Sequence, residues 1–115
     1  IPEILDKIGF RPTDYGQSLA DFEEDFGDVI DRKTTVIILG DGRSNHNDPR
    51  VDLMRWIHNR AKAVIWLNPE PKTFWGTGDS EMLRYLPFCH VAKVCRTVQD
   101  LEGIIDNVLK SYIRA

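Results

Sequence analysis

Cysteine is scarce in this sequence, and its scarcity excludes two classes of small protein. Only Cys89 and Cys95 are present among the 115 residues. Two thiols cannot staple a disulfide-rich scaffold, and without closely spaced histidines they do not match the ligand pattern of a structural zinc site. We therefore expect both thiols to be reduced, as is usual in a cytoplasmic protein.

Long apolar runs and an excess of basic charge are absent as well. No stretch approaches the roughly 20 apolar residues that span a bilayer, and the formal net charge of -3 offers no basic surface for nucleic acid. The first residues, Ile1-Pro2-Glu3, lack both a signal-peptide pattern and an initiator methionine. These features predict one cytoplasmic domain cut from a longer protein, with no membrane or nucleic-acid partner.

The clearest positive signal is an apolar run that ends on an acid. Residues 34–39 are mostly β-branched and apolar, and Gly40-Asp41-Gly42 follows them. Such a run is typical of a strand buried on both faces, in a parallel sheet covered by helices. Ligands bind beyond the carboxyl ends of these strands, so Asp41 is expected to handle a metal ion, a phosphate or a partner's carboxylate. The alternative is an aspartate that only reverses the chain.

Helix and strand patterns alternate along the chain. Strands are predicted at residues 34–39, 63–67 and 90–95, and helices at residues 13–31, 48–60, 79–85 and 97–112, with a helix tail or turn at residues 1–9. Asp48 is expected to cap the second of these helices, with Pro49 in its first turn. Thr97, with Asp100 three residues later, is expected to cap the last helix. The order predicts an α/β fold with three layers, a mainly parallel sheet of about three strands flanked by helices, as part of a Rossmann-like domain.

Apolar spacing also predicts which helix residues face the core. In the first helix these are Leu19, Phe22, Phe26, Val29 and Ile30, and in the last helix they are Leu101, Ile104, Ile105, Val108, Leu109 and Tyr112.

Two loops at predicted strand ends carry the residues that are suited to binding. Residues 41–48 are dense in the oxygen ligands that Mg²⁺ prefers. Residues 68–80 form a long loop without apolar periodicity, which indicates a functional segment. Within these loops Arg43 could hold a carboxylate or phosphate. Trp75 could either anchor its loop by packing or contact a partner.

Several short motifs resemble one known family. Gly40-Asp41-Gly42 at a strand end, with Thr13-Asp14-Tyr15-Gly16 one helix earlier, resembles the second half of a von Willebrand factor type A (VWA) domain. The CoxE-like branch of that family is similar to this chain at Asn45, Asn47-Asp48-Pro49-Arg50, Trp66-Leu67-Asn68-Pro69-Glu70-Pro71 and Trp75-Gly76-Thr77-Gly78-Asp79-Ser80. The resemblance covers residues 11–113 and implies a single partial VWA domain at residues 1–115, with the first strands of the fold upstream of it.

The resemblance also implies a metal-ion-dependent adhesion site. In the family this site combines an Asp-x-Ser-x-Ser motif, a threonine and a strand-end aspartate. Thr13 matches the threonine and Asp41 the aspartate, but the first motif has no counterpart here. Because Mg²⁺ needs several oxygens in near-octahedral geometry, we expect these 115 residues to bind it weakly or not at all. A complete site is expected only in the full-length protein.

The function implied by the resemblance is protein interaction, not catalysis. CoxE-like proteins are bacterial proteins linked to maturation of carbon monoxide dehydrogenase-type enzymes, and a MoxR-type AAA+ ATPase is the implied partner. The residues expected to contact a partner are Arg43, Ser44, Asn45, Asn47 and Trp75. The alternative is an enzyme in which Asp41 binds Mg²⁺ for phosphoryl transfer or hydrolysis, which would need a second acid close by.

Loss of the upstream strands has a consequence for assembly. In the VWA fold the strand that matches residues 34–39 is central, so without its neighbour it would present an open edge to other chains. We therefore expect a homodimer, a swapped form, or an added strand from residues 1–10, with the homodimer preferred.

Overall fold

The structure is a computed structural model that describes residues 4–5 and 15–113. Ile4–Leu5 form a short strand, β1, so the expected helix tail or turn at residues 1–9 is wrong at these two positions. A single turn of helix has little stability of its own, whereas a strand here pairs with the edge of its neighbour. Thr13, one of the two predicted metal ligands, lies outside the described residues.

A four-stranded parallel sheet forms the centre of the described structure. Its strands are β1, β2 (Thr35–Leu39), β3 (Ala63–Asn68) and β4 (Val91–Val94), and they lie in that order. All three neighbouring pairs are parallel. The predicted α/β class and the three predicted strands are confirmed, and the two-residue β1 joins them at the edge of the sheet. β1 is the added strand that was one of the three expected ways to cover the edge of β2.

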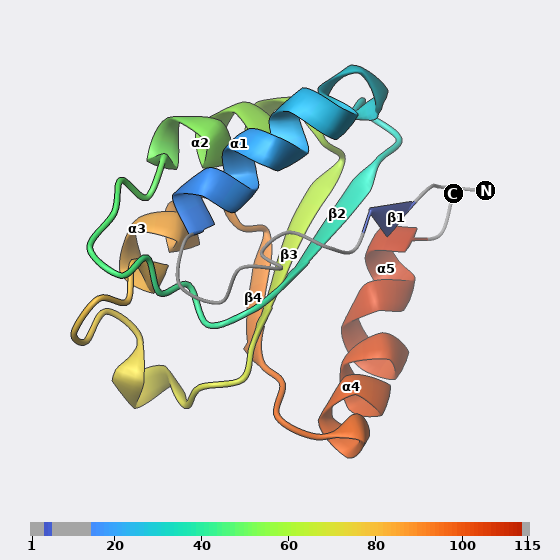
Figure 1. The fold of residues 1–115 in the computed structure, drawn as a ribbon. Coiled ribbons are helices and arrows are strands. Elements are labelled where there is room, and N and C mark those ends of the chain that lie inside the picture. The colour runs from blue at the N-terminus through green and yellow to red at the C-terminus, as the bar shows by residue number, and fades with distance from the viewer. Residues whose placement is uncertain (1–3, 6–14, 114–115) are drawn as a thin grey trace.

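Helices cover the sheet in two outer layers (Figure 1). The helical segments are α1 (Tyr15–Phe26), α2 (Val51–Arg60), α3 (Met82–Tyr85), α4 (Val98–Ile104) and α5 (Lys110–Ile113), with 3-10 turns at Gly27–Val29, Lys72–Phe74 and Leu86–Phe88 and a π-helical segment at Ile105–Leu109. Figure 1 shows α1, α2 and α3 on one side of the sheet and α4 with α5 on the other. None of the described helices has the length and apolar content needed to span a bilayer.

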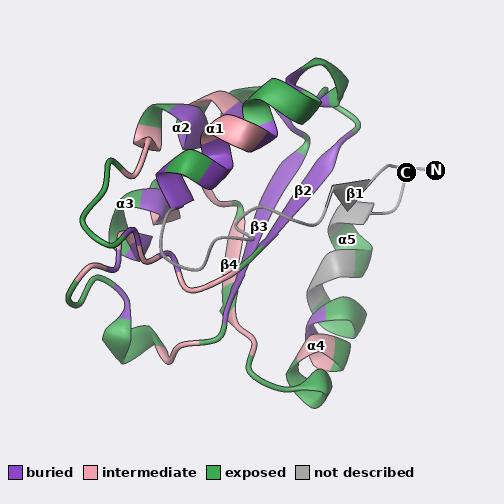
Figure 2. Ribbon diagram, in the orientation of Figure 1, coloured by how far each residue is buried: buried purple, intermediate pink, exposed green. Residues whose placement is uncertain are grey.

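The side chains of β2 alternate between two hydrophobic clusters. Val36 and Ile38 belong to the larger cluster, under α1 and α2. Ile37 belongs to a smaller cluster, where Ile65 and Ile104 also lie. The first four residues of β2 are buried, as the apolar run predicted, and Figure 2 shows the buried colour along most of β2 and β3. Burial on both faces fixes β2 as an inner strand and so fixes where Asp41 emerges.

The first long helix ends earlier than its apolar spacing predicted. α1 stops at Phe26, and a 3-10 turn replaces the remaining turn. Gly27 has little preference for a helix, and a Cβ there would lie 3.2 Å from the ring of Trp56. The change of helix type alters the phase of the following residues, so Val29 is exposed. Phe26, the last residue of α1, is exposed as well, and both outcomes are contrary to expectation.

The second helix does not begin at Asp48-Pro49. It begins at Val51, and Arg50 precedes it in the left-handed conformation, with φ of 51°. The carboxylate of Asp48 accepts a hydrogen bond from the Arg50 main-chain N–H at 2.9 Å, which forms a tight local turn instead of a helix cap. The left-handed Arg50 then separates this turn from the first residue of the helix, and so the helix starts later than predicted.

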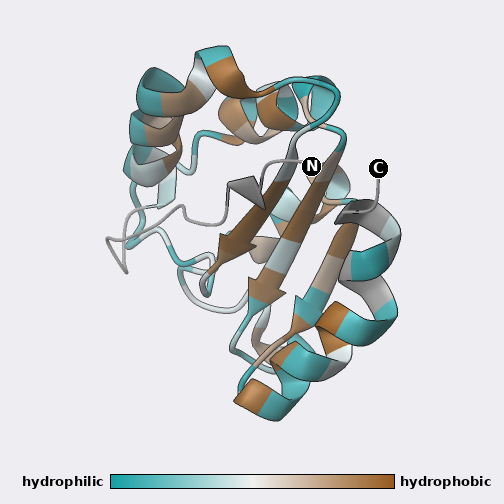
Figure 3. Ribbon diagram, turned by 90° about the vertical axis from the view of Figure 1, so that its right-hand side faces the viewer, coloured by the Kyte–Doolittle hydropathy of each residue, from teal (hydrophilic) through white to brown (hydrophobic). Residues whose placement is uncertain are grey.

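The C-terminal helical segment covers the second face of the sheet. Leu101 and Ile104 pack on that face as predicted, but Ile105 is exposed because it starts the π-helical segment, which shifts the phase of the stripe. The side chains of Val108, Leu109 and Tyr112 lie outside the described part of the structure. Figure 3 shows α4 and α5 beside this face, together with strand residues that are hydrophobic.

Candidate functional site

Two loops meet at the carboxyl edge of the sheet because all four strands run in parallel. The first loop, residues 40–50, follows β2, and the second loop, residues 69–81, follows β3. Asn68, the last residue of β3, is fully buried between them. Its side-chain amide donates to the carbonyl of Asp41 at 3.1 Å, and its Oδ1 accepts from the N–H of Glu70 at 2.8 Å. Asn68 therefore joins the starts of both loops.

Asp41 lies where the sequence placed it, immediately beyond the end of β2. Its side chain is half-buried, and Oδ1 accepts a hydrogen bond from the main-chain N–H of Arg43 at 2.9 Å. This contact is the turn-forming role that was the alternative interpretation of Asp41. The carboxylate has a second oxygen, so the turn does not use its full capacity as an acceptor.

Tyr15, at the start of α1, packs against the carboxyl end of β2. Its ring is buried 5.7 Å from that of Trp66, and a Cβ built on Gly40 would lie 1.6 Å from its hydroxyl oxygen. Burial, and then the nearby charge of Asp41, raise the pKa of Tyr15 to about 12. The hydroxyl lies against the main-chain N–H groups of Asp41 and Gly42. Only a glycine at position 40 permits this approach.

The next residue of α1 contacts the first loop directly. A Cβ on Gly16 would lie 1.8 Å from the carbonyl oxygen of Asp48. The first turn of α1 and the far end of the loop are therefore in main-chain contact, and this explains the Tyr15-Gly16 pair in the motif that the sequence singled out.

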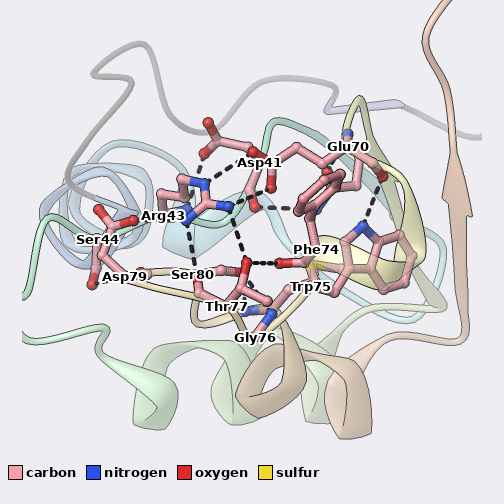
Figure 4. A network of polar contacts seen from close by, with 12 residues as sticks. Asp41, Arg43, Ser44, Glu70, Phe74, Trp75, Gly76, Thr77, Asp79 and Ser80 are labelled. Carbon is pink, nitrogen blue, oxygen red and sulfur yellow. Dashed lines mark hydrogen bonds and ion pairs between the residues drawn. The ribbon is translucent and has the colours of Figure 1, made fainter.

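Arg43 connects the first loop to the second (Figure 4). Its Nε and Nη2 donate to the two carboxylate oxygens of Glu70 at 2.9 and 3.0 Å, and Nη1 donates to Asp79 at 2.9 Å. Nη1 also donates to the carbonyl of Thr77 at 2.9 Å. We call Arg43, Glu70 and Asp79 the arginine clamp. Its bidentate geometry suits a planar guanidinium and sets the distance between the two loops.

Asp79 extends the clamp to the main chain of the first loop. Its second carboxylate oxygen accepts from the N–H of Asn45 at 2.9 Å, and its carbonyl accepts from the N–H of Ser44 at 3.1 Å. The hydrogen bond from Arg43, followed by that from Asn45, holds the pKa of Asp79 below its usual value. Hydrogen bonds to Glu70 and then Asp79 raise the pKa of Arg43. Arg43 and Asp79 therefore both keep their charges near neutral pH.

The second loop is packed around Trp75 and Ser80. The Trp75 ring is buried, and its N–H donates to the carbonyl of Glu70 at 2.9 Å. The buried hydroxyl of Ser80 accepts from the N–H of Gly76 at 3.0 Å and from that of Met82 at 3.3 Å. These contacts support the packing role of Trp75 that the sequence left open, and they anchor the loop at the start of α3.

The tip of the first loop is exposed and has an unusual main chain. Asn45 and His46 have φ of 53° and 62°, in the left-handed region. Asn45, His46 and Asn47 all expose their side chains, whereas Ser44 is fully buried. Of the five residues predicted to contact a partner, Asn45 and Asn47 are therefore open to solvent, and Ser44, Trp75 and Arg43 belong to the support beneath them.

The described residues do not by themselves fit a metal ion. Among residues 4–5 and 15–113, no group of three or more His, Cys, Asp or Glu side chains is arranged to hold one. The carboxylates of Glu70 and Asp79 already face the positive guanidinium of Arg43, which disfavours a cation beside them. Asp41 is left as a single donor, and a single carboxylate does not satisfy Mg²⁺.

Comparison with known families identifies the fold. The sequence profile described as "VWA domain containing CoxE-like protein" matches residues 11–104. The chain belongs to this CoxE-like VWA family. No curated protein and no solved structure matches the chain. In this CoxE-like VWA domain, residues of the motifs quoted from the sequence join the first loop to the second loop and to α1.

Sequence reasoning missed three parts of the site in this CoxE-like domain. The sequence named Tyr15, the pair Glu70 and Asp79, and Ser80 only as members of the quoted motifs, without these roles. The spacing of Arg43 from its acidic partners, 27 and 36 residues, gives no local signal. For the close approach of Tyr15 to Gly40, the one signal in the sequence was a glycine at the end of a buried strand.

Proposed function

We propose that this CoxE-like VWA domain is a protein-interaction module whose partner contacts the exposed tip of the first loop. The observation that carries the proposal is the combination of exposure and rigidity at Asn45, His46 and Asn47. Left-handed main chain at two successive non-glycine residues is costly and persists where neighbouring contacts hold it. Here the Asp79 side chain holds Asn45, and the N–H of Asn47 donates to the carbonyl of Ser44 at 3.0 Å.

A fixed polar tip suits recognition of another protein. Side chains that are held before binding lose less conformational entropy on association, and this favours affinity. Asparagine and histidine offer both donors and acceptors to main-chain and side-chain groups of a partner. The arginine clamp and the buried Trp75 lie beneath the tip and supply its support, so they act as positioning residues in this proposal.

Family membership supports a choice of partner for the first test. We infer a MoxR-type AAA+ ATPase as the partner, and maturation of carbon monoxide dehydrogenase-type enzymes in the cytoplasm as the process. Any Mg²⁺ dependence would require ligands from outside the described residues, because no group of three or more His, Cys, Asp or Glu side chains among them is arranged to hold a metal ion. Binding by the 115-residue chain is therefore expected to be independent of metal.

The test uses the 115-residue chain and a purified MoxR-type ATPase in biolayer interferometry. Asn45→Gly removes one tip side chain at a φ that suits glycine, and Asn47→Arg adds bulk beside it. We expect each variant to weaken binding by about tenfold or more. The matched control is Asn59→Arg, an exposed residue near the end of α2 at the opposite edge of the sheet, which should bind as the parent chain does.

Equal weakening by all three variants, or by none, would contradict the proposal. A loss of binding on adding EDTA would contradict the metal-independent part alone. Phosphatase and nucleotidase assays with Mg²⁺ or Mn²⁺ address the enzyme alternative, which predicts turnover that disappears in Asp41→Asn.

A further inference from the structure

Two histidines form a stacked pair at the edge of the sheet opposite to the candidate site. His58, on α2, lies with its ring centroid 4.8 Å from that of His90, and the two rings are 24° from parallel. His90 immediately precedes β4, and His58 lies close to the end of α2. The pair therefore joins a helix of one layer to the outer strand of the sheet.

Hydrogen bonds assign opposite protonation patterns to the two rings. The N–H of Val64 donates to Nδ1 of His90 at 2.9 Å, so this Nδ1 must be an unprotonated acceptor. Nδ1 of His58 lies 3.1 Å from the carbonyl oxygen of Phe88, which can only accept, so this Nδ1 carries a proton. The neutral His90 ring accordingly carries its proton on Nε2, and the neutral His58 ring carries it on Nδ1.

Protonation affects the two bonds differently. A second proton on His58 goes to Nε2 and leaves the bond to Phe88 intact. A second proton on His90 must go to Nδ1, where it would meet the N–H of Val64 and remove that hydrogen bond. The Val64–His90 contact also has a main-chain component, because the His90 N–H donates to the Val64 carbonyl at 2.8 Å. The start of β4 is thus held on β3 by two hydrogen bonds. Protonation of the His90 ring removes the one to its Nδ1 and leaves the main-chain one in place.

The surroundings oppose charge on His90. Burial, and next the charge of His58, lower the pKa of His90. The neighbouring Phe88 ring lies edge-on to His58 and has the guanidinium of Arg55 5.6 Å from its centroid. Burial raises the pKa of the Cys89 thiol to about 12, so this group stays neutral. His58, Arg55 and Cys89 therefore offer no negative charge to a protonated His90.

We propose that the stacked His58–His90 pair is a pH-sensitive latch, which holds the start of β4 and the end of α2 to β3 near neutral pH and loosens this edge of the sheet when the His90 ring is protonated. Loosening would uncover main-chain groups of β3 that can pair with another chain. The latch is independent of the partner-binding proposal, because it lies at the amino edge of the strands and uses none of the loop residues.

The direction of the pH effect follows from the lowered pKa of His90. The unfolded chain binds a proton at this ring more tightly than the folded chain does, so the contribution is fully present above about pH 6.5. It is lost as pH falls through the folded-state pKa. Between the two pKa values this ring should reduce the folding equilibrium constant by up to about tenfold per pH unit.

The test measures urea unfolding of the 115-residue chain between about pH 5 and pH 7.5. His90→Asn is the main variant, because its Oδ1 can accept from Val64 and does not titrate. We expect the unfolding free energy of this variant to depend less on pH than that of the parent chain, by the slope that corresponds to about one proton. His46→Asn, at an exposed position in the first loop, is the matched control and should retain the slope of the parent chain.

Nitrogen chemical shifts of the imidazole rings give a second test, and its first part uses the parent chain alone. At neutral pH the parent chain should show His90 protonated on Nε2 and His58 on Nδ1. In His58→Phe, which keeps a stacked ring without charge, the titration midpoint of His90 should move to higher pH. The same tautomer in both rings, an unmoved midpoint, or an unchanged pH slope in His90→Asn would each overturn the latch.

Discussion

Gly40 and Tyr15 show at the scale of single residues how the candidate site is positioned. The tyrosine hydroxyl occupies the space that a Cβ at position 40 would fill, and it lies against the main-chain N–H groups of the next two residues. The direction in which the main chain leaves β2 at Asp41 thus depends on the absence of a side chain at position 40 as much as on the strand itself. Selection for glycine at this position follows from packing, without any contribution from a ligand.

This contact predicts that Gly40→Ala destabilises the fold by about 1–3 kcal/mol, because the new methyl group overpacks the space beside Tyr15. Urea unfolding measures the change. The matched control is Gly103→Ala in α4, where a Cβ would meet nothing within 4 Å and removal of a helical glycine should stabilise by about 0.5–1 kcal/mol. A neutral Gly40→Ala variant would show that the Tyr15 contact is absent in solution.

Asp41 was predictable from sequence, whereas the arginine clamp was not. The position of Asp41 follows from local information, since an apolar run and a Gly-Asp-Gly ending specify a buried strand and its terminus. Arg43 pairs with acids 27 and 36 positions away, and those distances depend on how the second loop folds. Asn45 and Asn47 were named together with Ser44 as partner contacts, and nothing local in the sequence separated these two exposed residues from the buried serine.

At the scale of elements, the two predicted helix caps had opposite outcomes. Thr97 caps α4 as expected, and its hydroxyl accepts from the N–H of Asp100 at 3.0 Å. The Asp100 carboxylate in turn accepts a hydrogen bond, from the N–H of Arg96 and not from that of Thr97. Asp48 forms its own turn and leaves α2 without a side-chain cap. The difference lies in Arg50, whose left-handed main chain, with φ of 51°, separates Asp48 from the start of α2.

The cap at Thr97 predicts a loss of about 1 kcal/mol in the unfolding free energy for Thr97→Ala. Thr97→Ser keeps the hydroxyl and is the control, so its stability should stay close to that of the parent chain. Thermal unfolding followed by circular dichroism gives both values. A serine variant that is as unstable as the alanine variant would assign the effect to lost methyl packing instead of the cap.

At the scale of the whole molecule, β1 is the feature with the largest effect on assembly. It pairs Ile4 with Thr35 and Leu5 with Val36, and so it lies along the edge of β2 that the sequence identified as an open template. The sequence allowed for this outcome but preferred a homodimer, which stays a prediction. The choice depends on long-range pairing of two residues, and such pairing leaves no periodic pattern to detect.

Removing residues 1–5 should therefore increase self-association, because the edge of β2 loses its neighbour. Light scattering over a range of concentrations compares the shortened and intact chains. The control replaces Ile4 and Leu5 by valine, which retains a strand-forming pair. An intact chain that is already dimeric at low concentration would favour the homodimer over the covering strand.

Because the arginine clamp joins the two loops, neither loop can be transferred to another protein without the other. A graft of the first loop onto a related scaffold would carry a guanidinium with no acids to receive it, and a graft of the second would carry two half-buried like charges with no cation between them. Exchange between homologous scaffolds should therefore succeed only when both segments travel as a unit, together with the helix turn that Gly16 brings against them.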